Sequence, residues 1–287
     1  MSSPRAFVIG HPIGHSRSPM LHGYWLKHYG IEGSYEALDI PPHELTAFFG
    51  RLKQEGWAGG NVTVPHKAVV LGLVDRLEPA ARAVGAVNTV WWEGDTLVGD
   101  NTDASGFVDN LDETMPGWDA RAHRAVILGA GGAARSLAYG LRTRGIDVAL
   151  CNRNFDKAAE LAAHFGGGVS AHGLAELPEL MRAADLLVNA TSLGMVGQPA
   201  LSLDLAPLKR SAIVSDIVYA PLETGLLRDA RARGHSVVDG LGMLLHQAVG
   251  GFSRWFGRRP QVSRDLRDLL AADIRAKTAA APAQSGD

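Results

Sequence analysis

Three polar clusters in this chain carry residues that can hold, move or hydrogen-bond a proton. They are Asn61–Lys67, which ends in a lysine after a proline, then Ala86–Thr89 and Gly99–Gly106. Each is interpreted as a short apolar strand that ends in polar residues. Ligands of open α/β sheets bind outside the carboxyl ends of the strands. The three strand ends therefore present one cleft with a lysine, a carboxylate, hydroxyls and amides: Thr63, Lys67, Asn88, Thr89, Asn101 and Asp103.

Each of these residues also has an ordinary structural explanation. A lysine after Pro-His is most often a solvated surface residue, since lysines are rarely buried. The coincidence of three such strand ends favours chemistry over that explanation.

A glycine-rich segment lies between a predicted strand and a predicted helix. Gly129-x-Gly131-x-x-Ala134 follows Ala125–Leu128 and precedes Arg135–Arg144. Glycines let the backbone approach a pyrophosphate, and the helix N-terminus offers unpaired N–H groups. An ordinary strand-to-helix turn is the alternative. The context favours a dinucleotide site.

The next predicted strand indicates which dinucleotide. NAD sites place an acid at the tip of this strand, where it binds the ribose 2′-hydroxyl. Here Asp147–Cys151 is followed by Asn152-Arg153-Asn154, without an acid. Arg153 can bind a 2′-phosphate. Lys157 either adds a second positive charge or is a solvated helix residue. The sequence predicts NADP rather than NAD.

Two serines precede another predicted helix. Ser18 suits the N-cap and Pro19 the first helical position. With Ser16, this end of the helix offers hydroxyls and exposed N–H groups, which suit a carboxylate. Plain N-capping by Ser18 is the alternative.

Composition sets broad limits. The 287 residues are 46% hydrophobic and 20% charged, and the net charge of −2 argues against nucleic-acid or acidic-membrane partners. The single cysteine, Cys151, allows no internal disulfide and is expected to be a buried strand residue. No apolar run approaches the roughly 20 residues of a membrane span, and we expect no secretory leader. His11 and His15 cannot form a helical zinc pair across Pro12 and Gly14, so we expect no metal. These features predict a cytoplasmic protein.

Alternating strands and helices predict an α/β fold with largely parallel, helix-covered sheets. Strands are expected at Arg5–Gly10, Ser34–Ile40, Trp57–Val64, Val87–Trp92, Thr96–Gly99, Ala125–Leu128, Asp147–Cys151, Asp185–Ala190, Ala212–Val218 and Ser236–Val238. Helices are expected at Ser18–Gly30, Pro42–Gly56, Ala68–Leu77, Pro79–Val84, Ser105–Met115, Arg135–Arg144, Asn154–Phe165, Leu222–Arg233, Leu241–Phe256 and Val262–Thr278.

Several ordered motifs together give the chain a recognisable pattern. They are His15–Pro19, Asn61–Lys67, Ala86–Thr89, Gly99–Asp103, Gly129–Ala133, Asn152-Arg153, Asn189–Thr191 and Asp239–Met243. With these motifs the chain resembles the shikimate dehydrogenase family along nearly its whole length. The resemblance implies NADPH-dependent, reversible reduction of 3-dehydroshikimate to shikimate in chorismate biosynthesis. It implies an N-terminal substrate domain (residues 1–104), a Rossmann-type NADP domain (105–240) and C-terminal helices (241–287) that return to the first domain, with a cleft between the domains. A monomer or homodimer is expected.

The resemblance also implies roles for individual residues. Lys67 is the acid/base and Asp103 its partner. The implied substrate ligands are Ser16 and Ser18 for the carboxylate, Thr63 and Asn88 for ring hydroxyls, and Tyr219 and Gln247 to complete the pocket. The implied cofactor residues are Gly129, Ala130, Gly131, Gly132, Ala133, Asn152, Arg153, Asn154, Lys157, Thr191, Ile217, Gly240 and Met243.

Two departures and two rival functions accompany the resemblance. Gly23 and Asn154 stand where the family often has asparagine and threonine, which puts the Asn154 phosphate contact in doubt. A quinate/shikimate dehydrogenase of broader specificity is the close alternative, although Ser18 favours shikimate. A non-catalytic NADP-responsive binding protein is the distant one. The presence of both Lys67 and Asp103 argues against it.

Overall fold

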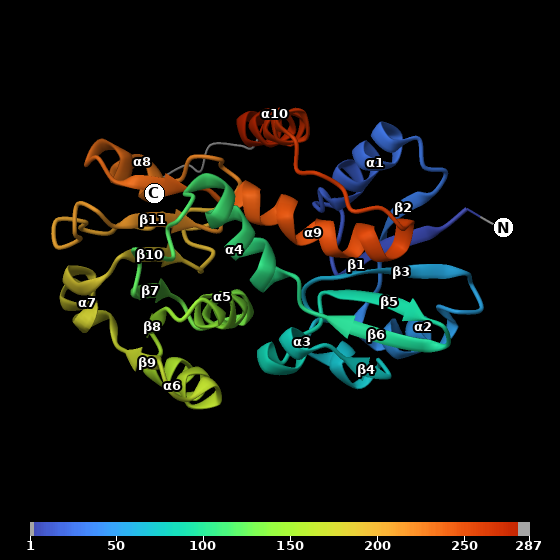
Figure 1. Cartoon of the computed structure of the whole chain (residues 1–287), viewed down its shortest axis with the longest axis horizontal. Coiled ribbons are helices and arrows are strands. Elements are labelled where there is room, and N and C mark those ends of the chain that lie inside the picture. Colours follow the sequence, from blue (N-terminus) through green and yellow to red (C-terminus); the bar gives the residue numbers. More distant parts are fainter. Residues whose placement is uncertain (1–2, 281–287) are drawn as a thin grey trace. The chain divides into compact units, whose positions relative to one another are not determined.

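The computed structural model describes residues 3–280, and the chain divides into two compact units (Figure 1). The first unit comprises the residues up to Ser105 together with Leu245–Leu270, and the second comprises Gly106–Leu244 and the residues from Ala271 onward. Each unit has its own six-stranded sheet with helices against it. The predicted α/β class is confirmed.

The first sheet is mixed, with the strand order β2-β1-β3-β5-β6-β4. Strands β1 (Arg5–Gly10), β2 (Ser34–Asp39) and β3 (Trp57–Val62) are parallel to one another. The hairpin of β5 (Thr89–Glu93) and β6 (Thr96–Asp100) adds an antiparallel pair next to β3, and β4 (Arg76–Leu77) runs parallel to β6 at the edge. Of the six strands of this sheet only β5 runs against the others, so the expectation of a largely parallel sheet is confirmed with this one exception.

The hairpin changes how the polar clusters meet. Because β5 runs antiparallel to its neighbours, its beginning lies beside the carboxyl ends of β3 and β6, with Thr89 in register with Asn61 and Asp100. Asn88 therefore precedes a strand and does not follow one, contrary to the sequence interpretation. All three clusters still meet at one edge of the sheet.

The helices of the first unit are α1 (Ser18–Tyr29), α2 (Leu45–Arg51), α3 (Pro79–Val84) and the part of α9 (Gly240–Phe256) from Leu245 onward. Of these helices, α2 is shorter than predicted, and the others match their predicted bounds to within one residue. The helix predicted at Ala68–Leu77 is a 3₁₀ turn at Val69–Gly72, because Arg76 and Leu77 pair with β6 instead. Gly30 ends α1 in the left-handed conformation, at φ 61°.

The second sheet is wholly parallel, in the order β9-β8-β7-β10-β11-β12. Its strands are β7 (Arg124–Leu128), β8 (Asp147–Cys151), β9 (Val169–His172), β10 (Leu186–Asn189), β11 (Ile213–Asp216) and β12 (Ser236–Val238). This is the order of doubly wound dinucleotide-binding domains, in which the ligand lies where the winding reverses. In this chain the reversal falls between β7 and β10.

The other helices are α4 (Asp103–Thr114), α5 (Gly132–Thr143), α6 (Phe155–Phe165), α7 (Leu177–Ala183), α8 (Gly225–Ala232) and α10 (Arg264–Ala280). Buried residues of α4 and α5, such as Leu111 and Leu137, share one core with β7 and β8. Strand β9 was not predicted from the sequence, because it is short and carries polar residues at Ser170 and His172. Helix α7 was not predicted either. None of the helices within residues 3–280 combines the length and apolar character needed to span a bilayer.

Close packing beneath the polar edge of the first sheet requires a glycine at position 60. A Cβ atom there would lie 2.2 Å from the Phe7 ring. That ring is fully buried and packs edge-on against Phe48 and Trp57. We expect Gly60→Ala to lower the free energy of unfolding by about 1–3 kcal/mol, since overpacking displaces buried rings.

Chemical denaturation measures this change, and Gly50→Ala is the matched control. Gly50 is an exposed residue of α2 with no atom within 4 Å of a built Cβ. Alanine favours a helix over glycine by up to about 1 kcal/mol, so this variant should be neutral or slightly stabilised. Equal stability of the two variants would contradict the packing argument.

Candidate active site

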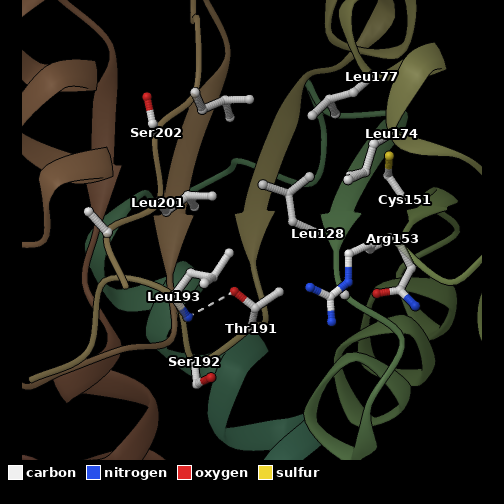
Figure 2. Close-up of a pocket in the computed structure, with 14 residues that line it drawn as sticks. Leu128, Cys151, Arg153, Leu174, Leu177, Thr191, Ser192, Leu193, Leu201 and Ser202 are labelled. Atoms are coloured by element: carbon white, nitrogen blue, oxygen red, sulfur yellow. Dashed lines mark hydrogen bonds between the residues drawn. The ribbon is translucent and has the colours of Figure 1, made fainter. Parts of the chain in front are cut away.

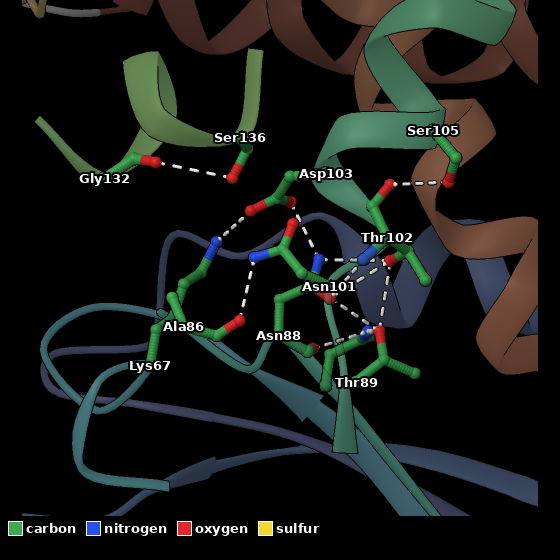
Figure 3. Close-up of polar contacts among 11 residues, drawn as sticks. Lys67, Ala86, Asn88, Thr89, Asn101, Thr102, Asp103, Ser105, Gly132 and Ser136 are labelled. Atoms are coloured by element: carbon green, nitrogen blue, oxygen red, sulfur yellow. Dashed lines mark hydrogen bonds and ion pairs between the residues drawn. The ribbon is translucent and has the colours of Figure 1, made fainter. Parts of the chain in front are cut away.

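The turn after β3 presents Lys67 to Asp103. The His66 backbone N–H donates to the Thr63 carbonyl at 2.9 Å, and Nε2 of the buried His66 ring lies 2.7 Å from the Ile40 carbonyl oxygen. These contacts fix the turn against the end of β2. The Lys67 Nζ atom donates to Asp103 Oδ2 at 2.5 Å (Figure 3).

Asp103 stands in the first turn of α4, where the helix dipole stabilises a carboxylate. Its second oxygen, Oδ1, accepts from Asn88 Nδ2 at 2.8 Å. Both carboxylate oxygens are therefore held, while the Lys67 side chain is 29% exposed and that of Asp103 15% exposed. The ammonium group can donate to one further oxygen without leaving its partner. Such a pair suits a step that holds or delivers a proton.

Two residues expected in the cleft are structural instead. Thr89 is 1% exposed and Asn101 is 2% exposed. The Thr89 hydroxyl donates to Asn88 Oδ1 at 2.9 Å, and Asn101 Nδ2 donates to the Ala86 carbonyl at 3.1 Å. Neither amide nor hydroxyl is presented to solvent, so the structure contradicts the expectation that both face a ligand.

The two serines take different positions from those expected. The N-cap of helix α1 is Arg17, whose side chain does not cap the helix, so Ser18 is the first helical residue and not the cap. The Ser16 hydroxyl instead accepts from the Ser18 backbone N–H at 3.3 Å. Ser18 is buried and Ser16 is partly exposed. The two hydroxyls remain at the start of α1.

The loop before α1 lies against the end of β3. The His11 N–H donates to the Val64 carbonyl at 3.1 Å, and a Cβ at Gly10 would lie 2.6 Å from the Thr63 methyl group. Thr63 thus lies beside this loop. His11 Nδ1 is 2.7 Å from Asp39 Oδ1. Within residues 3–280, no group of histidine, cysteine or acidic side chains is arranged to hold a metal ion.

In the second unit, the glycine loop joins β7 to α5. Gly129 has φ 112°, which favours glycine, and a Cβ there would lie 3.1 Å from Thr191. Gly131 is the N-cap of α5, and around Gly131 and Gly132 a built Cβ meets nothing within 4 Å. Helix α5 begins three residues earlier than predicted. The start of α5 is therefore open, and its first N–H groups are available to an anion.

The tip of β8 carries the predicted phosphate residues. Asn152 Nδ2 donates to the Asn154 carbonyl at 2.8 Å, and Asn154 Oδ1 accepts from the Lys157 N–H at 3.4 Å as the N-cap of α6. Asn154 therefore caps α6, which begins one residue later than predicted. Arg153 and Lys157 are exposed, and neither side chain has an acid within ion-pairing distance in the described part of the chain.

A cavity of about 620 Å³ lies between the ends of β7, β8 and β10. Figure 2 shows Arg153 and Thr191 facing each other across it, with leucines toward its other end. Sequence reasoning missed the apolar wall, which is Leu174, Leu177, Leu201 and Leu203. Leu174 and Leu177 follow β9, the strand that was not predicted. Cys151 also lines this cavity, but burial raises the pKa of its thiol to about 11, so it is not a nucleophile.

Buried polar residues hold the ends of β10 and β11 together. Asn189 Oδ1 accepts from the Thr191 hydroxyl at 2.7 Å, and Asn189 Nδ2 donates to Asp216 Oδ1 at 3.0 Å. Asp216 also accepts from the Val218 N–H at 3.0 Å and from the Thr224 hydroxyl at 2.7 Å. Sequence reasoning assigned no role to Asp216. The aspartate after an apolar strand was the available signal.

Three further predicted residues gather beside this strand end. A Cβ at Gly240 would lie 2.2 Å from the Ile217 carbonyl oxygen, so Gly240 and Ile217 are in direct contact. Ile217 and Met243 pack, partly buried, against the same core. Tyr219 follows in the second unit, whereas Gln247 belongs to the first unit and is buried.

Comparison with known proteins identifies similar chains. Three family models match: the shikimate dehydrogenase substrate binding domain at residues 8–90, shikimate/quinate 5-dehydrogenase at 112–197, and the shikimate 5′-dehydrogenase C-terminal domain at 240–267. The shikimate dehydrogenase (NADP(+)) of Azorhizobium caulinodans is 54% identical, over 95% of this chain and 98% of the relative.

Solved structures give the same picture. Shikimate 5-dehydrogenase from Thermus thermophilus, in complex with NADP(H) and shikimate, is 36% identical with a TM-score of 0.83, covering 94% of this chain and 99% of that one. Quinate dehydrogenase from Corynebacterium glutamicum, in complex with NAD, is 32% identical with a TM-score of 0.87 and the same two coverages.

The buried carboxyl of Asp216 predicts a pH dependence of stability. Burial raises the pKa of Asp216 from 3.8 to about 6, although its three hydrogen bonds act in the opposite direction. Between these values the folded protein holds a proton that the unfolded chain has lost. Stability should therefore fall as pH rises through this window, by on the order of 2–3 kcal/mol.

Asp216→Asn isolates this contribution, because asparagine does not titrate. The free energy of unfolding of both proteins is measured by denaturant at several values from pH 4 to pH 7. The wild type should lose stability relative to the variant as pH rises. A difference that stays constant across this range would contradict the raised pKa.

Proposed function

This chain belongs to the shikimate dehydrogenase family, and we propose that it catalyses the reversible NADPH-dependent reduction of 3-dehydroshikimate to shikimate. The observation that carries the proposal is the Lys67–Asp103 pair, in which both carboxylate oxygens are occupied and the ammonium is partly exposed. An NADP-linked alcohol–ketone interconversion needs one group that gives and takes the hydroxyl proton. Lys67 is that group.

The second unit fits the cofactor on its own geometry. The open start of α5 suits a pyrophosphate, and Arg153 supplies a cation at a strand tip that carries no acid. NADPH, when bound, supplies the hydride. Arg153, with Lys157 in support, binds the 2′-phosphate, and the cavity beside Thr191 takes the adenosine end. Ile217, Gly240 and Met243 line the nicotinamide end.

The first unit supplies the substrate ligands. Ser16 and Ser18 donate hydroxyls to the carboxylate of shikimate at the start of α1. Thr63 orients the ring hydroxyls beside Lys67, and Asn88, which is 3% exposed and donates to Thr102 and Asp103, acts on them by holding Asp103. In the direction of reduction, Lys67 Nζ gives a proton to the C3 oxygen, and Asp103 keeps the amine aimed at that oxygen. Gln247, in the same unit, completes this set of ligands.

Broader specificity is the second candidate. The similarity to a quinate dehydrogenase favours testing quinate and NAD as well as shikimate and NADP. Ser18 favours shikimate, because the additional C1 hydroxyl of quinate requires a pocket of different shape around the carboxylate. A binding protein without catalysis is the weaker candidate, since such a protein needs no lysine–aspartate pair. We also place the enzyme in the cytoplasm, as a monomer or homodimer.

Replacing the lysine tests the mechanism. Lys67→Met keeps much of the side-chain length and removes the proton. Because general acid–base catalysis contributes about 10²–10⁴-fold, kcat for shikimate oxidation should fall by at least 10²-fold, while KM changes much less. Absorbance of NADPH measures turnover, and circular dichroism checks the fold.

The control is Lys53→Met in the same unit. Lys53 pairs with Asp95 on the surface, and its side chain is 55% exposed. Exposed ion pairs contribute little, so Lys53→Met should retain wild-type turnover. A folded Lys67→Met enzyme within about threefold of wild type would remove Lys67 from the mechanism.

Cofactor preference is tested at Arg153. Arg153→Ala removes a charged hydrogen bond worth roughly 1.5–3 kcal/mol, so the Kd for NADP should rise about tenfold or more while that for NAD hardly moves. Binding titrations measure both constants. Arg182→Ala is the control, since Arg182 pairs on the surface with Glu179 of α7. Equal losses for the two cofactors would rule out the phosphate role.

A further inference from the structure

Tyr35 of β2 has no role in the reaction described so far. Its side chain is buried in the first unit, and its hydroxyl donates to Asn61 Oδ1 at 2.6 Å. A hydrogen bond this short between two buried side chains fixes both groups. Asn61 itself is 6% exposed and is the penultimate residue of β3.

From Asn61 an unbroken chain of hydrogen bonds leads to the catalytic pair. Asn61 Nδ2 donates to the Thr89 hydroxyl and to the Asn88 carbonyl, both at 3.1 Å. The Thr89 hydroxyl donates to Asn88 Oδ1 at 2.9 Å, and Asn88 Nδ2 donates to Asp103 Oδ1 at 2.8 Å. Figure 3 shows the last steps, from Thr89 through Asn88 to Asp103 and Lys67.

The Tyr35 hydroxyl is protonated in its buried position. Burial raises the pKa of Tyr35 well above its usual value, while a hydrogen bond with the Ser18 side chain acts in the opposite direction. The phenol therefore keeps the proton that it donates to Asn61. This donated hydrogen bond joins Tyr35 to the chain that ends at Asp103.

The Tyr35 ring is also held. It stacks on His22 of α1 with ring centroids 4.0 Å apart, and Trp255 of α9 lies against it at 5.8 Å. Burial lowers the pKa of His22 to about 3, although an interaction with Asn61 opposes the shift, so the ring is neutral at physiological pH. The Tyr35 ring is therefore packed between two uncharged rings, which hold its orientation.

We propose that Tyr35 is a positioning residue for the reaction: its ring stacks on His22 of α1, and its hydroxyl, through Asn61, Thr89 and Asn88, keeps the Lys67–Asp103 pair in register with that helix. This inference rests on the proposed function. The role is to align two parts of the substrate site that lie on different elements, α1 and the β3–β5–β6 edge. Tyr35 itself touches neither substrate nor cofactor.

Tyr35→Phe removes the hydroxyl and keeps the ring on His22. Both kinetic constants for shikimate should respond: kcat falls and KM rises, because Asp103 and the Lys67 ammonium that it aims are less well held. The loss of one neutral hydrogen bond corresponds to a fall in kcat/KM of roughly three- to tenfold. KM for NADP should stay at the wild-type value. Loss of folded protein alone would lower kcat and leave both KM values unchanged.

Two further substitutions separate alignment from general destabilisation. Tyr24→Phe removes a tyrosine hydroxyl that bonds Ser263 in the same unit at 3.3 Å, outside the chain, and should leave the kinetics unchanged. Thr89→Val breaks the chain at its centre and should lower kcat, whereas Thr89→Ser keeps the hydroxyl and should retain most of the activity. The double variant Tyr35→Phe/Thr89→Val should lose less than the product of the single losses, because both act through Asn88.

The outcomes are distinct. Tyr35→Phe kinetics equal to those of Tyr24→Phe would overturn the inference and leave the proposed function intact. Strictly multiplicative losses in the double variant, or equal activity of Thr89→Val and Thr89→Ser, would overturn the connection through Asn61 and Thr89. A wild-type enzyme without activity on shikimate would overturn the proposed function, and this inference with it.

Discussion

The contact on which the first unit depends is the pairing of the Lys67 ammonium with the Asp103 carboxylate. A partly buried ion pair is tolerated only when the remaining hydrogen-bonding capacity of both groups is satisfied. Asp103 meets this condition with Asn88 and with its position at the start of α4. The cost of placing a carboxylate there is offset by neutral donors, so the pair can remain accessible to a small polar molecule.

This requirement explains the sequence around the site. Asn88 must donate to Asp103, so its own carbonyl-type oxygen, Oδ1, needs donors, which are the Thr102 N–H at 2.8 Å and the Thr89 hydroxyl. The amide and hydroxyl residues at this sheet edge therefore satisfy one another first and a ligand second. The second unit follows the same logic with Asn189 and Asp216, where one buried amide joins two strand ends. In both units, buried polar groups set the geometry of exposed ones.

Much of this arrangement could be predicted from sequence. The strands β1, β7 and β8 carry continuous apolar runs, the glycine loop has a distinctive spacing, and Lys67 stands beyond a strand-ending proline. The predictions that were wrong or absent have physical explanations. A strand entering a sheet antiparallel reverses which of its ends carries the site, and nothing local to Asn88 encodes that direction. Ser18 has the composition of an N-cap, yet it lies one residue inside α1, because Arg17 already has helical backbone angles. The polar strand β9 and the leucines after it depend on tertiary packing and gave no periodic signal.

The exposed position of Arg153 has a consequence for how such an enzyme can change. Its guanidinium has no acidic partner within residues 3–280, and it stands at a strand tip whose turn is held by Asn152 and Asn154. Substitutions at exposed positions outside such networks usually cost little stability. Thr63, Asn88 and Asp103, by contrast, belong to a turn and to networks that other residues need. During evolution, the cofactor preference of this fold can therefore change through single substitutions at the surface. A change of substrate requires several coordinated substitutions within a buried network.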